Sequence, residues 1–161
     1  MPPRARKSKE PTTAGARETA LRALSRREHS AAELHYKLTH RGHAPEVAAQ
    51  LVSQLTEAGW QSDARYAEML VRNRAQQGYG PLRIEHELAA AGIADAEIQA
   101  ALAAAECDWR ALCVQLRARK FKATPRATAD WQKQYRFLAS HGFTAEQIRA
   151  ALKGLPVDVE S

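Results

Sequence analysis

The sequence predicts an all-α protein built as a tandem array of three three-helix repeats, elongated and curved. One observation is compositional. Alanine supplies 33 of the 161 residues, whereas Leu, Ile, Val and Phe together supply only 28, which is few for a deep core. Only ten of these are Val or Ile, the residues that favour strands. The other observation is periodic: Gly42, Gly92 and Gly142 stand fifty residues apart, between apolar residues at helical spacing. Stacked repeats of this kind present long faces to a large partner.

Each repeat contains a helix, a glycine stop and a second helix. A leucine stands four residues before each glycine, at Leu38, Leu88 and Leu138. Glycine suits the end of a helix because it adopts positive φ without a steric penalty. Ile93 and Phe143 follow their glycines directly and can fold back on the preceding helix, whereas His43 stands at that place in the first repeat.

A further helix precedes each of these pairs. Ser62 is a predicted N-cap for the leading helix of the second repeat, which ends at Gly78-Tyr79-Gly80-Pro81. Ser30-Ala31-Ala32-Glu33 is a capping box in the first repeat, and Thr124-Pro125 marks the break in the third. The expected organisation is a disordered basic leader at 1–16, repeats at 17–59, 60–107 and 108–153, and a flexible tail at 154–161.

The charge is distributed in blocks. Residues 1–29 sum to +5, residues 81–106 to −4 and residues 107–126 to +5, within a net charge of +6. Each basic block is either a solvated helix face or a surface for a polyanion, and the sequence leaves both readings open. The cations of the second basic block are Arg110, Arg117, Arg119, Lys120, Lys122 and Arg126.

Several classes of protein are disfavoured. No apolar run approaches the roughly 20 residues that cross a bilayer, and Met1 to Lys9 carries charge and proline instead of a signal peptide, so we expect a soluble, cytoplasmic protein. Cys107 and Cys113 have neither redox nor metal spacing, and we expect both to be reduced packing residues.

No catalytic or cofactor motif is found, so we expect no enzyme activity, no cofactor and no metal. The glycines at 78 and 80 lack a preceding strand and are interpreted as a turn between helices. No cysteine or carboxylate joins His35, His40 and His43 at ligand spacing. The aromatic residues weighed as stacking platforms are expected to be core residues, because they lie beside leucines at helical spacing. They are Tyr66, Tyr135, Trp109 and Trp131.

The central part of the chain closely resembles the signature of the RecX family. The matching residues include Asp63-Ala64-Arg65-Tyr66-Ala67, Val71-Arg72-Asn73-Arg74, Gly78-Tyr79-Gly80-Pro81-Leu82-Arg83-Ile84, Glu87-Leu88 and Gly92-Ile93. The resemblance extends over about residues 18–153, through Lys37-Leu38 and Arg41-Gly42 in the first repeat and Arg136-Phe137-Leu138 in the third. Ala91 and His141 stand where the family often has a basic residue.

The resemblance implies a cytoplasmic bacterial regulator of RecA, the recombinase that polymerises on single-stranded DNA. Such proteins consist of three-helix repeats, lie in the helical groove of the RecA–DNA filament and inhibit its growth, ATP hydrolysis, strand exchange and coprotease activity. They thereby modulate homologous recombination, DNA repair and the SOS response. The expected partners are the RecA filament and its single-stranded DNA, with weak non-specific binding to DNA alone, and the expected state is a monomer.

Two kinds of contact are expected with such a filament. The basic blocks would meet DNA phosphates or acidic RecA surface, and the acidic residues 81–106 would meet basic patches on RecA. For Arg72, Arg74 and Arg83 the alternative is structural: pairing with Glu68, Glu87 or a helix end. The candidate contacts are Arg72, Arg74, Arg83, Arg117, Arg119, Lys120 and Lys122.

An alternative function is direct DNA binding by helix-turn-helix or Myb-like modules, without RecA. A Myb-like array would carry several tryptophans in each repeat, and this chain has three in total. The last helix of each repeat also lacks the cluster of Arg, Asn and Gln that reads base edges. A general helical adaptor, with no dependence on a filament, is a third possibility.

Overall fold

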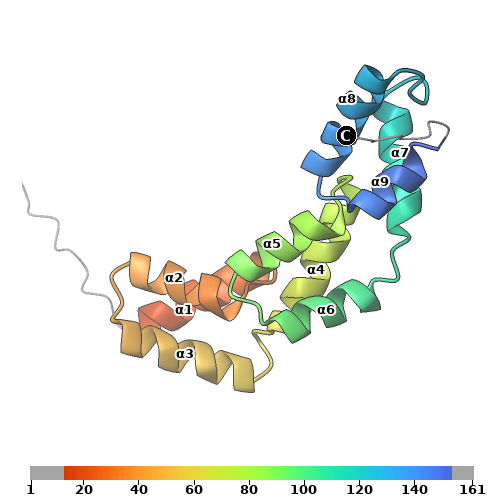
Figure 1. Ribbon diagram of the computed structural model, residues 1–161. Helices are drawn as coiled ribbons and strands as arrows, with labels where there is room; N and C mark the ends of the chain where they lie inside the picture. The colour runs from red at the N-terminus through yellow and green to blue at the C-terminus, as the bar shows by residue number, and fades with distance from the viewer. Residues whose placement is uncertain (1–12, 154–161) are drawn as a thin grey trace, which may run out of the picture. The chain divides into compact units, whose positions relative to one another are not determined.

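The computed structural model describes residues 13–153, and the secondary structure of this range is entirely helical, as predicted (Figure 1). The helices fall into three sets of three. The leader up to residue 12 and the tail from 154 lie outside the described residues, and α1 begins four residues before the expected start of the first repeat. The helices are α1 (Thr13–Arg26), α2 (Ala31–His40), α3 (Pro45–Glu57), α4 (Asp63–Gln76), α5 (Pro81–Ala90), α6 (Asp95–Ala104), α7 (Trp109–Lys120), α8 (Thr128–Ser140) and α9 (Ala145–Ala151).

Local side chains start the helices where the sequence predicts. The Ser30 hydroxyl accepts a hydrogen bond from the Glu33 backbone N–H at 3.1 Å, and the Glu33 carboxylate accepts one from the Ser30 N–H at 3.2 Å. This reciprocal pair is the predicted capping box. Ser62 likewise accepts from the Arg65 N–H at 3.2 Å, and Pro81 is the first residue of α5.

The three periodic glycines end the middle helix of each repeat. Gly42, Gly92 and Gly142 have φ values of 92°, 81° and 90°, which confirms the predicted helix stops. The N–H of the next residue returns to the carbonyl of the leucine that precedes each glycine by four. His43 makes this return as Ile93 and Phe143 do, and it is only 9% exposed. The first repeat therefore uses an imidazole where the other two use an apolar side chain.

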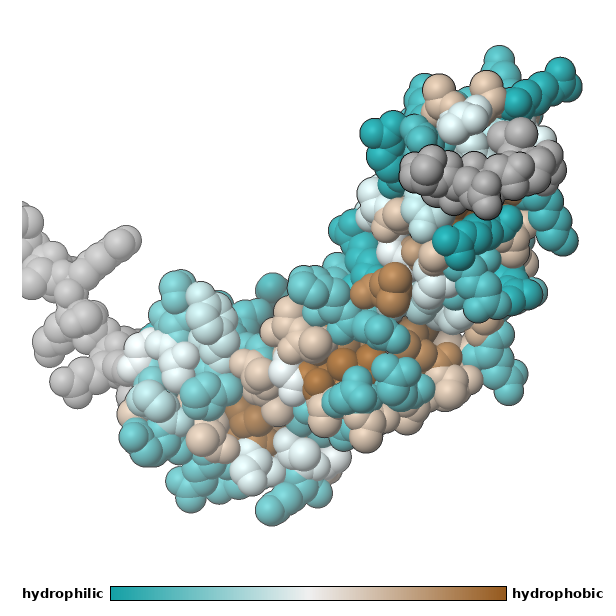
Figure 2. Space-filling model, in the orientation of Figure 1, coloured by the Kyte–Doolittle hydropathy of each residue, from teal (hydrophilic) through white to brown (hydrophobic). Residues whose placement is uncertain are grey.

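The chain forms two compact units, with the boundary after Tyr66, inside α4. The core of the first unit joins three alanines of α1 to leucines of α2 and α3. Because alanine is small, α1 can lie close to its neighbours, at the cost of a thin core. Figure 2 shows hydrophilic residues over much of the visible face, with hydrophobic residues exposed in patches between them. The buried core residues are Ala16, Ala20, Ala23, Leu34, Leu38, Ala48, Leu51, Val52 and Leu55.

The second unit includes the core of the third repeat, where α7 packs along α9. Cys113, Leu138, Phe143 and Ile148 are at most 2% exposed there, and Trp131 packs against them. Both cysteines are free thiols. None of the helices in residues 13–153 has the length and apolar character needed to cross a membrane.

Candidate functional site

Two glycine turns of the second unit touch through their backbones. The Gly80 N–H donates a hydrogen bond to the His141 carbonyl at 2.7 Å, and the Leu82 N–H donates one to the Gly142 carbonyl at 2.9 Å. A Cβ on Gly80 would lie 2.5 Å from the carbonyl carbon of Gly142, and a Cβ on Gly142 would lie 2.5 Å from the Cβ of Arg83. The loop between α4 and α5 is therefore held against the turn between α8 and α9 at a distance that only glycine allows.

A row of stacked side chains lies on this contact. The Tyr79 ring stacks on His141 with centroids 5.5 Å apart, and the Arg83 guanidinium lies 3.9 Å from the Tyr79 centroid. His141 lies against Phe137 at 4.4 Å, and the Lys120 ammonium is 5.6 Å from the Phe137 centroid. We call Arg83, Tyr79, His141, Phe137 and Lys120 the junction stack. It brings together cations from α5 and α7 that are distant in the sequence.

The cations of this region are not neutralised by carboxylates within the described chain. Five ion pairs are present in residues 13–153, and Arg83, Arg119, Lys120 and Lys122 take part in none of them. All four of these residues are exposed. Exposed cations without counter-charges attract polyanions, because binding releases the counterions of the polyanion. The pairs are Arg22 with Glu18, Arg27 with Glu33, Arg65 with Glu28, Arg74 with Glu87 and Arg110 with Glu146.

Arg117 differs from its neighbours in α7. It is half-buried, and its Nε and Nη1 atoms are enclosed without a hydrogen-bond partner in the described chain. The Oε1 atom of Gln134, in α8, is likewise buried without a hydrogen-bond partner in the described chain. Arg117 therefore offers less of its guanidinium to an outside partner than Arg119 or Lys120 does.

The remaining two candidates, Arg72 and Arg74, are not members of the junction stack. Arg74 donates through Nε to the Glu87 carboxylate at 2.7 Å and through Nη1 to Gln77 at 2.9 Å, so it ties α4 to α5. This is the structural alternative considered for Arg74. Arg72 is exposed, has no ion pair in residues 13–153, and lies beside a hollow near Glu68. The structure thus places Arg83 and Lys120 in one row of side chains, which does not include Arg72 or Arg74.

A second patch, on α2 in the first unit, was missed by the sequence analysis. Tyr36 is 67% exposed and stacks on His40 with centroids 5.6 Å apart. Lys37, Arg41 and Arg27 line the same shallow hollow of about 390 Å³. We call these five residues the α2 patch. Its signal in the sequence was the tyrosine between Leu34 and Leu38, at a position that cannot face the core while they do.

The α2 patch and the part of the junction stack that α8 supplies lie at equivalent places in the first and third repeats. Lys37 and Arg41 stand exactly two repeat lengths before Phe137 and His141. The intervening repeat has Glu87 and Ala91 at these positions, and Glu87 is paired with Arg74. The outer repeats therefore present cations and aromatic rings where the middle repeat presents an internal ion pair.

Other residues singled out in the sequence belong to the framework. Tyr66 is 5% exposed and its hydroxyl donates to Glu33 at 3.2 Å, while Trp131 and Tyr135 stack at 5.1 Å beside the third core. No cluster of three His, Cys, Asp or Glu residues suited to a metal ion occurs in residues 13–153. His35 lies 3.2 Å from the Pro45 carbonyl, and His43 is buried.

These features define an all-α repeat protein that presents unneutralised cations on its surface. Family models for RecX match all three repeats: the first three-helix domain at residues 16–55, the second at 62–102 and the third at 106–152. The chain belongs to the RecX family of regulatory proteins.

Relatives and solved structures agree with this assignment. The chain is 42% identical to regulatory protein RecX of Chromohalobacter salexigens, over 84% of this chain and 90% of the relative. It is 45% identical to regulatory protein RecX of Stenotrophomonas maltophilia, over 88% and 87%. The crystal structure of RecX from Lactobacillus salivarius shares its fold, with a TM-score of 0.76 at 21% identity, over 88% of this chain and 94% of that one. A regulatory role follows from the family.

Proposed function

We propose that this chain regulates the RecA recombinase by binding in the helical groove of the RecA–DNA filament. There it inhibits filament growth, ATP hydrolysis, strand exchange and coprotease activity, and so modulates homologous recombination, DNA repair and the SOS response. The protein acts in the cytoplasm as a monomer and works by binding, without catalysis of its own.

The set of exposed cations without ion pairs, Arg83, Arg119, Lys120 and Lys122, is the observation that carries this proposal. Single-stranded DNA in the filament supplies the phosphates that such cations bind. A repeat array can also touch several successive protomers, so that weak contacts combine through effective concentration. Affinity for the filament would then exceed affinity for one RecA subunit or for DNA alone.

The test is RecA ATPase activity on single-stranded DNA, with and without the purified protein. Wild-type protein should inhibit, and reversal of three exposed cations, R119E/K120E/K122E, should raise the half-inhibitory concentration tenfold or more. Tenfold corresponds to about 1.4 kcal/mol of binding free energy. The matched control is R4E/R6E/K7E, which removes the same charge from the leader and should have a smaller effect.

Full inhibition by both triple variants would show that these cations are only solvated surface.

Binding to DNA in the absence of RecA distinguishes the proposed function from the alternative, which is direct DNA binding. We expect weak binding that is nearly indifferent to sequence and steeply reduced by salt. A strong preference for one duplex site at physiological salt would favour the direct DNA-binding function instead.

A further inference from the structure

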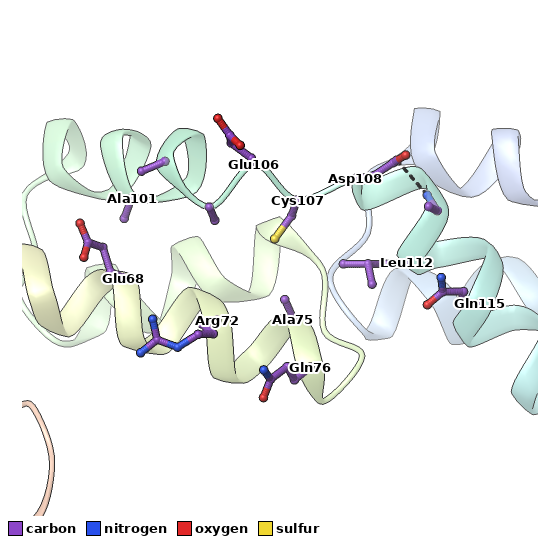
Figure 3. A pocket seen from close by; sticks show the side chains of 13 residues that line it. Glu68, Arg72, Ala75, Gln76, Ala101, Glu106, Cys107, Asp108, Leu112 and Gln115 are labelled. Carbon is purple, nitrogen blue, oxygen red and sulfur yellow. Dashed lines mark hydrogen bonds between the residues drawn. The ribbon is translucent and has the colours of Figure 1, made fainter.

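A hollow of the second unit lies on a part of the surface that the junction stack does not use. It has a volume of about 710 Å³ and opens between α4, α6 and the start of α7 (Figure 3). Figure 3 shows the Cys107 sulfur and the Leu112 side chain directed into it from one end, with Ala75 on the α4 side. Four further alanines line it, Ala101, Ala104, Ala105 and Ala111, and its remaining lining is polar or charged. We call it the alanine groove.

The groove lies between α4 and α6, where the side chains that line it, Ala75, Ala101 and Ala104, are small. The alanines of α6 leave the space between them unfilled. Glu106, with φ at 49°, then turns the chain out of α6 toward α7 and closes one side of the hollow.

The rim of the groove is acidic. Glu68, Glu106 and Asp108 border it against the single cation Arg72. Glu68, Glu106 and Arg72 take part in none of the ion pairs of residues 13–153, and the Asp108 carboxylate accepts the Ala111 N–H at 3.0 Å. The groove therefore combines an apolar floor with an excess of negative charge, which is the complement of an apolar side chain flanked by lysine or arginine.

We propose that the alanine groove is a docking site for a segment of RecA that carries an apolar side chain with lysine or arginine beside it. The identity of the partner rests on the proposed function; the chemistry of the segment rests on the groove. The apolar side chain would lie against Leu112 and the alanines, whose small side chains let a partner backbone approach closely, and its cations would lie beside Glu68 and Glu106. The protein would then hold the filament through two surfaces of opposite charge, the junction stack and the groove.

Cys107 provides a built-in reporter for occupancy of the groove. Its thiol is half-buried and lines the hollow, and burial raises its pKa, so it reacts with a maleimide slowly but measurably at mildly alkaline pH. The second thiol does not interfere, because Cys113 is fully buried and burial raises its pKa to about 11. RecA assembled on single-stranded DNA should slow the labelling of Cys107 at least fivefold. The variant C107S should still inhibit RecA, because the thiol is only the site of labelling and is not proposed to contact the partner.

Two variants block the groove without touching the junction stack. A104F fills it with a ring from an exposed position, and E68K/E106K reverses its rim charge. Each should raise the half-inhibitory concentration in the RecA ATPase assay tenfold or more. The matched controls are A96F, at an exposed alanine of the same helix that does not line the groove, and E46K/E57K, at exposed glutamates of α3. Each control should change that concentration less than twofold, and circular dichroism should show that all four variants remain helical.

The outcomes separate this proposal from the proposed function. If wild-type protein inhibits RecA but A104F inhibits equally well and the filament leaves Cys107 labelling unchanged, the groove proposal is overturned and the function stands. If wild-type protein neither inhibits RecA nor is protected by the filament, both are overturned. Loss of inhibition in A104F and E68K/E106K, with protected Cys107 in the wild type, supports the groove as the docking site.

Discussion

The loop between the first two helices of a repeat is held by opposite means in the two units. In the first unit, the loop before α2 is held by polar side chains. Gln61 donates to the His29 carbonyl at 3.1 Å, Asp63 accepts the Ala31 N–H at 2.8 Å, and Arg65 pairs with Glu28 at 3.0 Å. In the second unit, the loop before α5 is held by direct backbone contact between Gly80 and the turn at Gly142.

The difference shows two ways to satisfy buried backbone groups. The first places side-chain donors and acceptors around the loop, so that its stability is divided among several hydrogen bonds of about 1 kcal/mol each. The second relies on the absence of side chains, so that any added carbon enters occupied space. A single substitution at a glycine contact should therefore cause a large loss of unfolding free energy. A single substitution in the polar network should cause a smaller loss, because the other hydrogen bonds remain.

The largest expected effect is from Gly142→Ala. Its Cβ would lie 2.5 Å from the Arg83 Cβ and 2.6 Å from the Arg83 nitrogen, and Gly142 has φ at +90°. Overpacking costs roughly 1–3 kcal/mol and positive φ roughly 1–2 kcal/mol for an L side chain. We expect the free energy of unfolding, measured by urea denaturation, to fall by about 3 kcal/mol or more.

Two further glycine variants resolve this effect into its causes. Gly59→Ala has the same kind of φ, at +80°, but its Cβ would meet nothing within 4 Å, so it should lose only about 1 kcal/mol. Gly80→Ala has the clash without positive φ and should fall between the two. Equal losses for Gly59→Ala and Gly142→Ala would show that the backbone contact contributes nothing.

A smaller effect is expected from Gln61→Ala in the polar network. Gln61 is 1% exposed, donates to His29 and Asp63, and accepts the Thr56 hydroxyl at 2.7 Å. Its removal leaves the buried His29 carbonyl without this donor, which costs about 2 kcal/mol. The same denaturation experiment measures it, with exposed Gln54→Ala as the control expected within about 0.5 kcal/mol of wild type. A loss no larger than that of the control would show that the hydrogen bonds of Gln61 do not stabilise the loop.

The smallest expected effect is a pH dependence carried by His29. Burial lowers its pKa below the ordinary value of 6.5, so the unfolded chain binds this proton more readily than the folded chain. The contribution of the neutral, buried His29 to the free energy of unfolding is fully present above pH 6.5 and is lost as the pH falls below that value. His29→Gln should therefore flatten the decline in unfolding free energy between about pH 7 and pH 5. The exposed control His86→Gln should leave it unchanged, and an unaltered slope in His29→Gln would contradict the assignment.

Much of the fold could be predicted because its signals are local. Ser30 and Ser62 cap their helices, Pro81 opens α5, and the periodic glycines end helices with positive φ, all through atoms within a few residues. The burial of His43 could not be predicted from its residue type, because an imidazole is polar, yet it is buried as Ile93 is. Its burial depends on the shape of the turn, which the glycine imposes on all three repeats.

The candidate site was only partly accessible to sequence reasoning. The sequence alone determined the helices, the fifty-residue repeat and the blocks of charge, since composition and spacing suffice for these. Which cations are free was decided by the tertiary structure, which pairs Arg74 with Glu87 and places Arg83 over Tyr79. The glycine contact, the α2 patch and the alanine groove were decided there too. The physical reason is that pairing, exposure and unfilled space depend on distances between segments far apart in the chain, and no local pattern encodes those distances.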